Sequence, residues 1–381
     1  MGSNKTILPG GTIGILGSGQ LGRMLALAAR EMGYRVHVYS PGTDTPAGHI
    51  ADREICGAYD DAEKIRDFAS QVDVVTFEFE NVASAASDTA AEVTLVRPAG
   101  AVLHITQQRL REKNALKKHG FPVPGFAEVD SLNDLKQAAE TLGIPAVLKT
   151  ASFGYDGKGQ QKVMPGDSLD TIFANLGGAQ GIYEAFVDFE KEVSVVAARN
   201  SLGEFKAFPV FENVHANHIL DVTFAPADIG AALAKQAGEL AAGIFEALDV
   251  VGVMAVELFV TKTGELLVNE LAPRTHNSGH LTIDACVTSQ FEQQVRAICG
   301  LPLGSTELKA PAAMANLLGD LWAGGEPDWA AALGDSNVKL HLYGKAEARA
   351  GRKMGHLNVT GETTGDAAGR ARAARARLKQ A

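Results

Sequence analysis

Residues 253–271 contain two apolar segments, rich in β-branched residues, on either side of a Lys-Thr-Gly turn, and this pattern predicts a β-hairpin. If Thr263 and Gly264 form the turn, Glu257 lies directly opposite Glu270, with mostly apolar residues on both faces of the hairpin. Opposed carboxylates repel each other unless they share a proton, contact cations or bind a divalent metal ion. The alternative is a register in which one glutamate points to solvent or pairs with a lysine. Because both faces are apolar, the pattern favours a Mg²⁺ site.

Polar residues next to this hairpin extend the predicted site. Asn269 adjoins Glu270 and adds a neutral oxygen ligand, while Arg274 and His276 follow after a proline. The sequence therefore predicts a basic, polar substrate wall just downstream of the metal site.

A second candidate site lies between residues 144 and 160. Lys149 stands in a short apolar segment, where a charged side chain needs an anion close by. Gly154, Gly157 and Gly159 follow, interleaved with Lys158, and the backbone N–H groups of such a loop can approach phosphates closely. The loop is not a Walker A sequence, and alone it is equally typical of an exposed hairpin turn. Together with Lys149 and the glutamate hairpin, it favours a clamp for a triphosphate.

The N-terminal segment, residues 12–39, has the pattern of a βαβ unit, with Gly17, Gly19 and Gly22 spaced as in dinucleotide-binding loops. Such a site needs an acidic residue at the end of the second strand, and Ser40 stands there instead. We therefore expect the glycines to serve the tight turn and close helix packing, without NAD, although an anion could still rest on the helix N-terminus.

Two further groups of charged residues are ambiguous. Glu78 and Glu80 end a predicted strand, at the edge of an open α/β sheet where ligands bind, and a solvated strand end is the equal alternative. Near the C-terminus, Arg349, Arg352, Lys353 and His356 cluster beside glycines. This cluster is either a solvated basic loop or a phosphate receptor.

Composition sets outer limits on function. The chain has 381 residues, enough for two or three domains, and a formal net charge of −10, which argues against general nucleic-acid binding. Its three cysteines lack metal-ligand spacing, and no apolar run is long enough to span a bilayer. The N-terminus lacks the apolar core of a signal peptide. We expect a cytoplasmic protein without a membrane partner. A basic, alanine-rich segment, residues 370–379, predicts a terminal helix with a solvated face or a fraying end.

Over residues 10–360 the chain resembles the ATP-grasp superfamily, and within it the enzymes that carboxylate 5-aminoimidazole ribonucleotide in purine biosynthesis. The resemblance rests on four segments in one order, residues 17–24, 154–160, 269–280 and 351–356. It implies an α/β and α+β fold, in which an ATP-grasp fold follows a Rossmann-like domain and precedes a small β-rich domain. We place the Rossmann-like domain at 1–100, the ATP-grasp domain with its lid at 101–305, and the C-terminal domain with its basic tail at 306–381.

The resemblance also implies a reaction. ATP would phosphorylate bicarbonate to carboxyphosphate, whose carboxyl group would pass to the exocyclic amine of 5-aminoimidazole ribonucleotide, releasing ADP and phosphate. Mg²⁺ is the implied cofactor, and a homodimer is the implied assembly. Three alternatives stay open: a related ATP-grasp ligase that uses formate or an amino acid, a Rossmann oxidoreductase, and a non-catalytic nucleotide sensor.

Matched position by position, the resemblance assigns roles to individual residues. The ATP contacts would be Arg109, Lys149, the lid Gly154, Tyr155, Asp156, Gly157, Lys158, Gly159 and Gln160, the segment Glu184, Ala185, Phe186 and Val187, and Glu192, His215, Asn269 and Glu270. The substrate contacts would be Glu78, Tyr155, Arg274, His276, Lys345, Arg352 and Lys353, and the metal ligands Glu257 and Glu270. Asp156, Arg274 and Lys353 would be catalytic, with Asp156 orienting or deprotonating the amine. One departure from the family pattern is Gln108, where an aspartate is expected.

Overall fold

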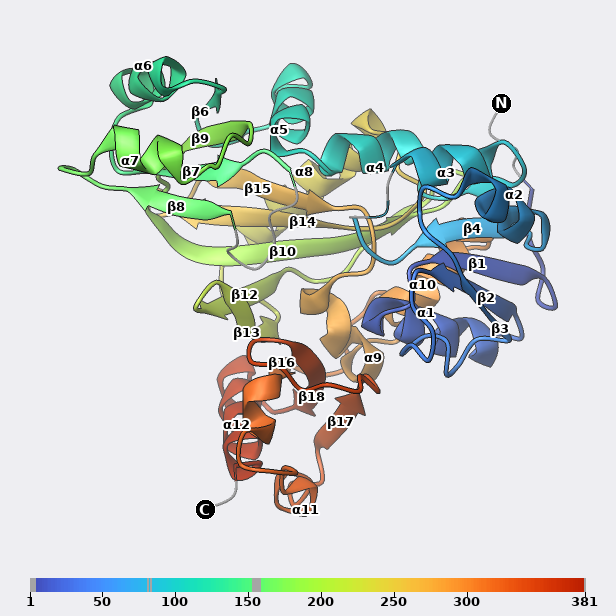
Figure 1. The fold of residues 1–381 in the computed structure, drawn as a ribbon. Coiled ribbons are helices and arrows are strands. Elements are labelled where there is room, and N and C mark those ends of the chain that lie inside the picture. The colour runs from blue at the N-terminus through green and yellow to red at the C-terminus, as the bar shows by residue number, and fades with distance from the viewer. Residues whose placement is uncertain (1–4, 81, 83, 153–158, 380–381) are drawn as a thin grey trace.

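The computed structural model describes residues 5–80, 82, 84–152 and 159–379, and these residues form three β-sheets (Figure 1). The first sheet is parallel, with strand order β3-β2-β1-β4-β5. Its strands are β1 (Thr12–Leu16), β2 (Arg35–Ser40), β3 (Arg53–Cys56), β4 (Val74–Phe77) and β5 (Leu95–Val96), and its helices are α1 (Gln20–Glu31), α2 (Ala62–Ser70) and α3 (Ser84–Ala91). The predicted βαβ unit is therefore present, and β1 is buried along its whole length, as expected of an inner parallel strand.

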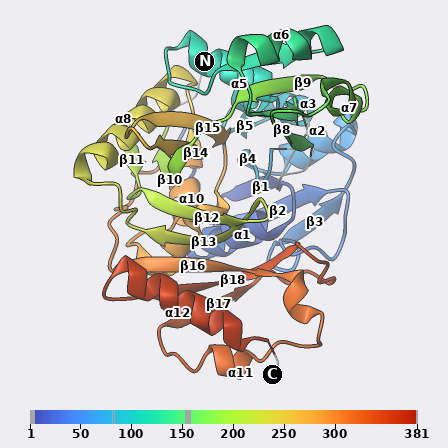
Figure 2. The same cartoon turned by 90° about the vertical axis from the view of Figure 1, so that its left-hand side faces the viewer.

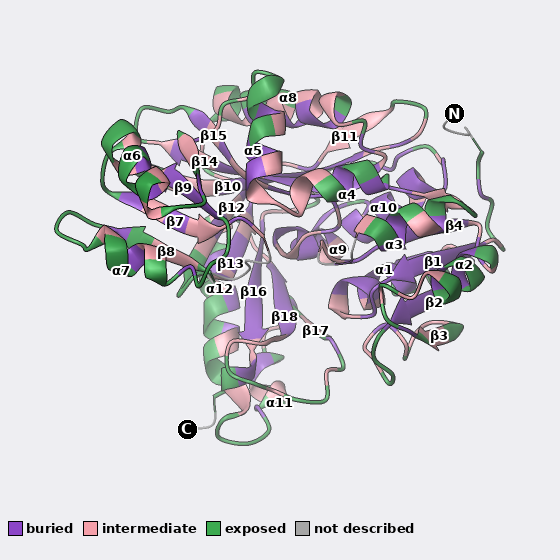
Figure 3. Ribbon diagram, turned by 45° about the horizontal axis from the view of Figure 1, so that its top comes forward, coloured by how far each residue is buried: buried purple, intermediate pink, exposed green. Residues whose placement is uncertain are grey.

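The second sheet is small and antiparallel, with order β6-β9-β7-β8. Its elements are β6 (Phe126–Val129), β7 (Ala146–Thr150), β8 (Gln160–Val163) and β9 (Gly181–Ala185), covered by α6 (Leu132–Leu142) and α7 (Leu169–Ala174). Both helices lie on the outside of the molecule and expose their outer surfaces (Figure 3). The chain reaches this sheet from the first one through α4 (Gly100–Thr106) and α5 (Arg109–Lys118).

The third sheet has nine strands, in the order β15-β14-β10-β12-β13-β16-β18-β17, with β11 also paired to β10. Figure 2 shows these strands following one another from β15 at the top to β17 near the bottom. The strands are β10 (Phe189–Arg199), β11 (Phe205–Ala207), β12 (Phe211–Ala216), β13 (Ile219–Ala225), β14 (Gly252–Thr261), β15 (Leu266–Ala272), β16 (Ala312–Leu318), β17 (Val338–Leu342) and β18 (Lys353–Thr360). The accompanying helices are α8 (Ala231–Ala247), η1 (Asn277–Leu281), α9 (Thr282–Ala285), α10 (Gln290–Ile298), η2 (Gly319–Trp322), α11 (Trp329–Ala332) and α12 (Thr364–Arg377).

The C-terminal strands continue the same sheet, because β16 pairs with β13. The predicted terminal helix is confirmed as α12, but it begins at Thr364, before the predicted start, and ends at Arg377. Its alanine face, with Ala371 and Ala374, packs against β16 and β18, and Leu378 is fully buried beyond the last turn. The small side chain of alanine allows this close contact between helix and sheet. The basic residues of the segment had indicated a solvated helix instead.

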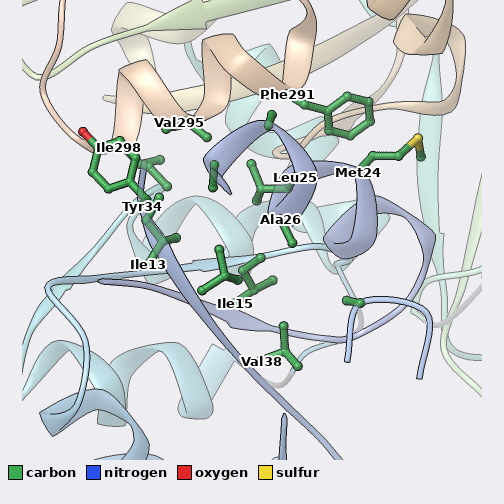
Figure 4. Packing of buried hydrophobic residues seen from close by; sticks show 14 of the residues in the cluster. Ile13, Ile15, Met24, Leu25, Ala26, Tyr34, Val38, Phe291, Val295 and Ile298 are labelled. Atoms are coloured by element: carbon green, nitrogen blue, oxygen red, sulfur yellow. The ribbon is translucent and has the colours of Figure 1, made fainter. Parts of the chain in front are cut away.

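Helix α10 fixes the first sheet against the third. Its apolar face, with Phe291, Val295 and Ile298, enters the same core as Ile13 of β1 and Leu25 of α1 (Figure 4). Burial of these side chains is worth about 1.5–3 kcal/mol each. The two sheets are therefore held together by a shared core, and polar residues at their junction are kept in fixed relative positions.

Within the described part of the chain, no helix has the length and apolar character needed to cross a membrane.

Candidate active site

A cavity of about 1220 Å³ opens where the three sheets meet. The first sheet contributes Glu80, the second Lys149, and the third Glu192, Glu257 and Glu270. Further lining residues that the sequence predicted are Arg109, Gln160, Phe186, His215, Asn269, Arg274, His276 and Lys353. Residues scattered over most of the chain thus converge on one cavity.

The predicted pairing of Glu257 with Glu270 is present in the β14–β15 hairpin. The turn differs from the predicted one: the Thr261 N–H donates to the Glu265 carbonyl, and the turn therefore holds three residues with Gly264 at φ +80°. Beyond Glu257 the register shifts by one residue, and Asn269 is the additional residue on β15. This bulge restores the pairing and sets Asn269 beside the two carboxylates at the cavity.

Helix α5 holds this bulge in place. Strand β15 is an edge strand, and the Lys113 ammonium group donates to the carbonyl oxygens of Val268 (2.9 Å) and Asn269 (2.5 Å). The adjacent Glu112 carboxylate accepts from the Leu271 N–H (3.1 Å). Both α5 side chains are buried. They provide the hydrogen bonds that a neighbouring strand would otherwise supply to the strand that carries Glu270.

The two opposed carboxylates each contact a basic side chain. The Glu257 Oε1 atom lies 2.9 Å from His276 Nε2, and the Glu270 Oε2 atom lies 3.2 Å from Arg109 Nη1. Burial acts to raise the pKa of Glu257, but the contact with His276 and the nearby bases outweigh burial and lower that pKa. The Glu257 carboxylate is thus held in the charged form that metal binding requires.

Arg274 is aimed at the cavity by an acid from the first sheet. Its guanidinium contacts the Glu80 carboxylate, and it donates to the Thr275 carbonyl (3.0 Å). Burial raises the pKa of Glu80, but Arg274 outweighs burial and lowers it to about 2. The second of the two glutamates at the end of β4 is therefore part of the site, through Arg274.

The second sheet supplies a further buried ion pair. Lys149 Nζ on β7 lies 2.6 Å from Glu184 Oε2 on β9. Burial acts to raise the pKa of Glu184, and Lys149 together with Lys113 lowers it overall. The anion that the apolar setting of Lys149 required is thus present, and the lysine remains at the cavity wall.

An apolar corner of the cavity lies beside this pair. Phe189 and Phe259 stack with ring centroids 4.8 Å apart, and Phe186 is exposed nearby in the segment after β9. His215 lies on β12 and contacts the Glu192 carboxylate; this hydrogen bond outweighs burial and raises the pKa of His215. Stacked aromatic rings next to a charged pair suit a nucleoside.

The glycine loop of the first sheet is filled by the protein itself. The Glu78 carboxylate accepts from the N–H groups of Gly19 and, at 2.7 Å, Gly22. A Cβ atom on Gly17 would lie 2.3 Å from the Glu78 side chain. Burial raises the pKa of Glu78 more than these hydrogen bonds lower it. The anion that rests on this helix N-terminus is thus a glutamate, and a dinucleotide pyrophosphate would meet it there.

The basic C-terminal cluster is only partly at the cavity. Lys353 lines it, whereas Arg352 donates to the Glu347 carbonyl (2.8 Å) and is not among the lining residues. Lys345 donates to the Lys353 carbonyl (2.7 Å) and acts electrostatically on Glu78. Arg349 pairs with Glu347 at the surface.

The predicted lid lies mostly outside the described residues, since 154–158, with Tyr155 and Asp156, are not among them. Gly159 has φ +72°, which favours glycine. Gln160 begins β8, and its Nε2 atom lies 3.3 Å from Nδ1 of His218. Ala185 and Val187, which the family pattern places at the nucleotide, flank Phe186 but are not among the lining residues. Gln108, which stands where an aspartate was expected, caps α5, because its side chain accepts from the Arg111 N–H (2.9 Å).

The donor set suits Mg²⁺. Glu257, Glu270 and the Asn269 carboxamide offer oxygen atoms, which hard divalent cations prefer. Among the described residues there is no cluster of three or more acidic, histidine or cysteine ligands.

Comparison with known protein families defines the class of enzyme. Residues 11–107 match the ribonucleotide synthetase preATP-grasp domain, residues 114–291 the ATP-grasp domain, and residues 312–370 the phosphoribosylaminoimidazole carboxylase C-terminal domain. The fold, the cavity and these matches define an ATP-grasp ligase.

Individual relatives narrow the class further. The chain is 45% identical over 355 residues to N5-carboxyaminoimidazole ribonucleotide synthase of Bacillus subtilis (93% of each chain) and 46% identical over 357 residues to that of Brucella melitensis (93% of this chain, 98% of the relative). A crystal structure of an ADP complex of N5-carboxyaminoimidazole ribonucleotide synthetase superposes with a TM-score of 0.93 at 43% identity, covering 99% of this chain and 100% of the other. The synthase of Aspergillus clavatus, in complex with ADP and 5-aminoimidazole ribonucleotide, gives a TM-score of 0.88 at 32% identity over 98% and 99%. The chain belongs to the N5-carboxyaminoimidazole ribonucleotide synthase family. The fold, the family and the reaction class expected from the sequence are confirmed.

Several residues at the site were not predicted. Phe189, Phe259, Glu112 and Lys113 acquire their roles only through partners distant in sequence. Glu80, which the sequence left open between a ligand contact and a solvated strand end, acquires its role through Arg274. For Phe259 the sequence did contain an indication of its place at the site. It is two residues from Glu257 and therefore lies on the same face of the strand.

Proposed function

We propose that the cavity binds ATP, bicarbonate and 5-aminoimidazole ribonucleotide together and catalyses the ATP-dependent carboxylation for which the family is named. One observation supports this most: Lys149, the opposed pair Glu257 and Glu270, and the bases Arg274 and His276 all face one cavity. A triphosphate on Lys149 and Arg109 would therefore lie between the paired carboxylates and a basic pocket for small anions. The phenylalanines around Phe186 would take the adenine ring.

The reaction proceeds in two steps. A bicarbonate oxygen attacks the γ-phosphorus of ATP, so that carboxyphosphate forms and ADP leaves. The exocyclic amine then attacks the carboxyl carbon, the new C–N bond forms, phosphate leaves and the amine loses a proton. Arg274, held by Glu80, steadies the carboxyphosphate. Asp156 is the proposed proton acceptor, and it lies outside the described residues.

Glu257 and Glu270, with Asn269, would hold Mg²⁺. When bound, this ion neutralises charge that develops on the transferred phosphoryl group. Lys345, Lys353, Arg352 and Tyr155 are the proposed contacts of the ribonucleotide, together with Glu78, which would have to exchange its glycine-loop hydrogen bonds for the ribose hydroxyls.

The test is ADP formation with and without bicarbonate and the ribonucleotide, alongside incorporation of labelled bicarbonate. We expect Mg²⁺-dependent ADP formation that the ribonucleotide strongly stimulates. Glu270→Gln should abolish it while leaving the fold intact, and Glu265→Gln, on the exposed turn of the same hairpin, is the matched control. Full activity in Glu270→Gln, or equal stimulation by formate or an amino acid, would refute the proposal.

We also infer a cytoplasmic homodimer. An exposed free thiol, Cys56, suits a reducing compartment. Light scattering of the purified protein tests the dimer, and a monomer mass at assay concentrations would contradict it.

A further inference from the structure

A chain of side-chain hydrogen bonds runs through the core of the third sheet to the cavity wall. It links Thr223 Oγ1 to Asn213 Oδ1 (3.0 Å), Asn213 Nδ2 to Ser194 Oγ (3.0 Å), Ser194 Oγ to Ser278 Oγ (2.8 Å) and Ser278 Oγ to His276 Nδ1 (2.8 Å). On the far side of the ring, His276 Nε2 lies 2.9 Å from Glu257 Oε1. The members of this chain of hydrogen bonds come from β13, β12, β10 and η1, and it ends beside a carboxylate of the proposed metal site.

The four residues behind the histidine are almost inaccessible, since Thr223, Ser194 and Ser278 are 0% exposed and Asn213 is 6% exposed. Buried polar groups are costly unless every one is hydrogen-bonded, and apolar residues of similar shape would fill such a core at least as well. Strand pairing does not require these side chains, because it uses the backbone. A fully connected polar chain at this place therefore indicates a task beyond stability.

The His276 ring determines which groups donate and which accept along this chain of hydrogen bonds. His276 Nε2 lies 2.9 Å from the Glu257 carboxylate, which can only accept, so this contact is favourable with the ring proton on Nε2. At the other ring atom, the Ser278 main-chain N–H lies 3.4 Å from Nδ1, so Nδ1 is an acceptor. The Ser278 hydroxyl therefore donates to Nδ1 and accepts from Ser194. Ser194 in turn accepts from the Asn213 amide, whose oxygen accepts from Thr223.

The main chain of His276 is held separately. Gln290, fully buried at the start of α10, accepts from the His276 N–H (2.8 Å) and donates to the His276 carbonyl (2.7 Å). The backbone position is thus fixed by Gln290, and what remains for Ser278 to set is the rotation and protonation of the ring.

We propose that Ser278 and Ser194 are positioning residues that hold the His276 ring with Nδ1 as the acceptor from Ser278 and with the Nε2–H directed into the cavity. This rests on the proposed function, in which His276 belongs to the substrate wall. In this form the ring donates to Glu257 or to an anionic oxygen of the substrate. The other tautomer would turn a lone pair toward both of these negative groups.

The experiment is nitrogen NMR of the full-length protein labelled with ¹⁵N-histidine, with His276→Asn identifying the His276 signals among those of ten histidines. The wild type should show one pyrrole-type nitrogen, Nε2, and one pyridine-type nitrogen, Nδ1. Ser278→Ala and Thr223→Val, which removes the far end of the chain with little change of shape, should move both signals toward averaged values. Ser87→Ala is the matched control, because Ser87 is a buried serine whose hydroxyl has no hydrogen-bond partner within the described structure.

Activity supplies the second readout. Removing the partner of a functional histidine commonly costs 10–100-fold, so kcat of Ser278→Ala should fall by about tenfold or more, with KM for ATP nearly unchanged. A merely structural role would lower Tm in Ser278→Ala but leave the nitrogen signals in place, which would overturn the proposal, as would a wild-type Nδ1–H tautomer. Unchanged kcat with shifted signals would overturn the positioning role. Failure of the proposed function is distinguishable, since wild-type protein would then show no ribonucleotide-dependent ADP formation whatever its tautomer.

Discussion

The ammonium nitrogen of Lys113 lies 2.5 Å from the main-chain carbonyl oxygen of Asn269, and a helix side chain thereby anchors the bulge next to Glu270. This link joins α5, which follows the first sheet, to the edge strand of the third. The position of Glu270, one carboxylate of the proposed metal site, thus depends on a lysine that precedes Asn269 by 156 residues in the sequence.

Replacing Lys113 by methionine keeps the apolar stem but removes both hydrogen bonds to β15. We expect a loss of about 3 kcal/mol in the free energy of unfolding, because the buried carbonyl oxygens of Val268 and Asn269 lose their charged donor. Urea unfolding measures this loss, and ADP formation should also fall. Lys118→Met, an exposed position on the same helix, is the control. Unchanged stability and activity in Lys113→Met would show that the bulge does not need this anchor.

The contact between Glu80 and Arg274 should make stability depend on pH. The folded-state pKa of Glu80 is lowered to about 2 from its usual 4.5, so its contribution is complete above pH 4.5 and is lost as the pH falls toward 2. We expect Glu80→Gln to cost about 2 kcal/mol at pH 7, less than the full shift implies because the side chain is 32% exposed and partly screened. Unfolding curves at pH 7 and pH 3.5 should show this cost shrinking in acid. A cost independent of pH would contradict the ion pair.

Lys149 is expected to act on ATP affinity. A hydrogen bond to a charged group contributes about 1.5–3 kcal/mol, so Lys149→Met should weaken ATP binding by roughly 10- to 100-fold. Isothermal titration with a non-hydrolysable ATP analogue measures the change. Lys136→Met, on the exposed helix α6, should bind like the wild type. Equal affinities for the two variants would remove Lys149 from the nucleotide site.

The facing of Glu257 and Glu270 was predictable from the sequence, but the reason given for it was incomplete. A two-residue turn predicts this pairing, and the actual three-residue turn alone would have offset it by one. The bulge at Asn269 cancels the offset. Alternation of apolar residues locates a hairpin, but it carries no information about a bulge whose hydrogen bonds are made by Lys113.

Contacts distant in sequence set a second limit. The strand end at Glu80 looked equally suited to solvent, and its partner Arg274 is 194 residues away. The predictions that succeeded rest on local patterns, such as the strand around Lys149 and the hairpin. The predictions that stayed undecided depend on which edges of the sheets meet. The core shared by α1 and α10 determines this, and its contacts are distant in sequence.

The occupied glycine loop gives the last prediction. Because the Glu78 carboxylate already accepts from Gly19 and Gly22, a pyrophosphate would have to displace a buried acid from the same N–H groups. We expect no binding of NADH, measured by its fluorescence at concentrations up to those used for ATP.

Gly17→Ala should be destabilising by about 2 kcal/mol or more, since its φ of +107° is strained for alanine and its methyl group would lie 2.3 Å from Glu78. Gly10→Ala separates the two causes, because Gly10 also has positive φ, at +93°, but has nothing within 4 Å of its Cβ position. Saturable NADH binding, or equal costs for the two glycine variants, would mean that Glu78 does not fill the loop in solution.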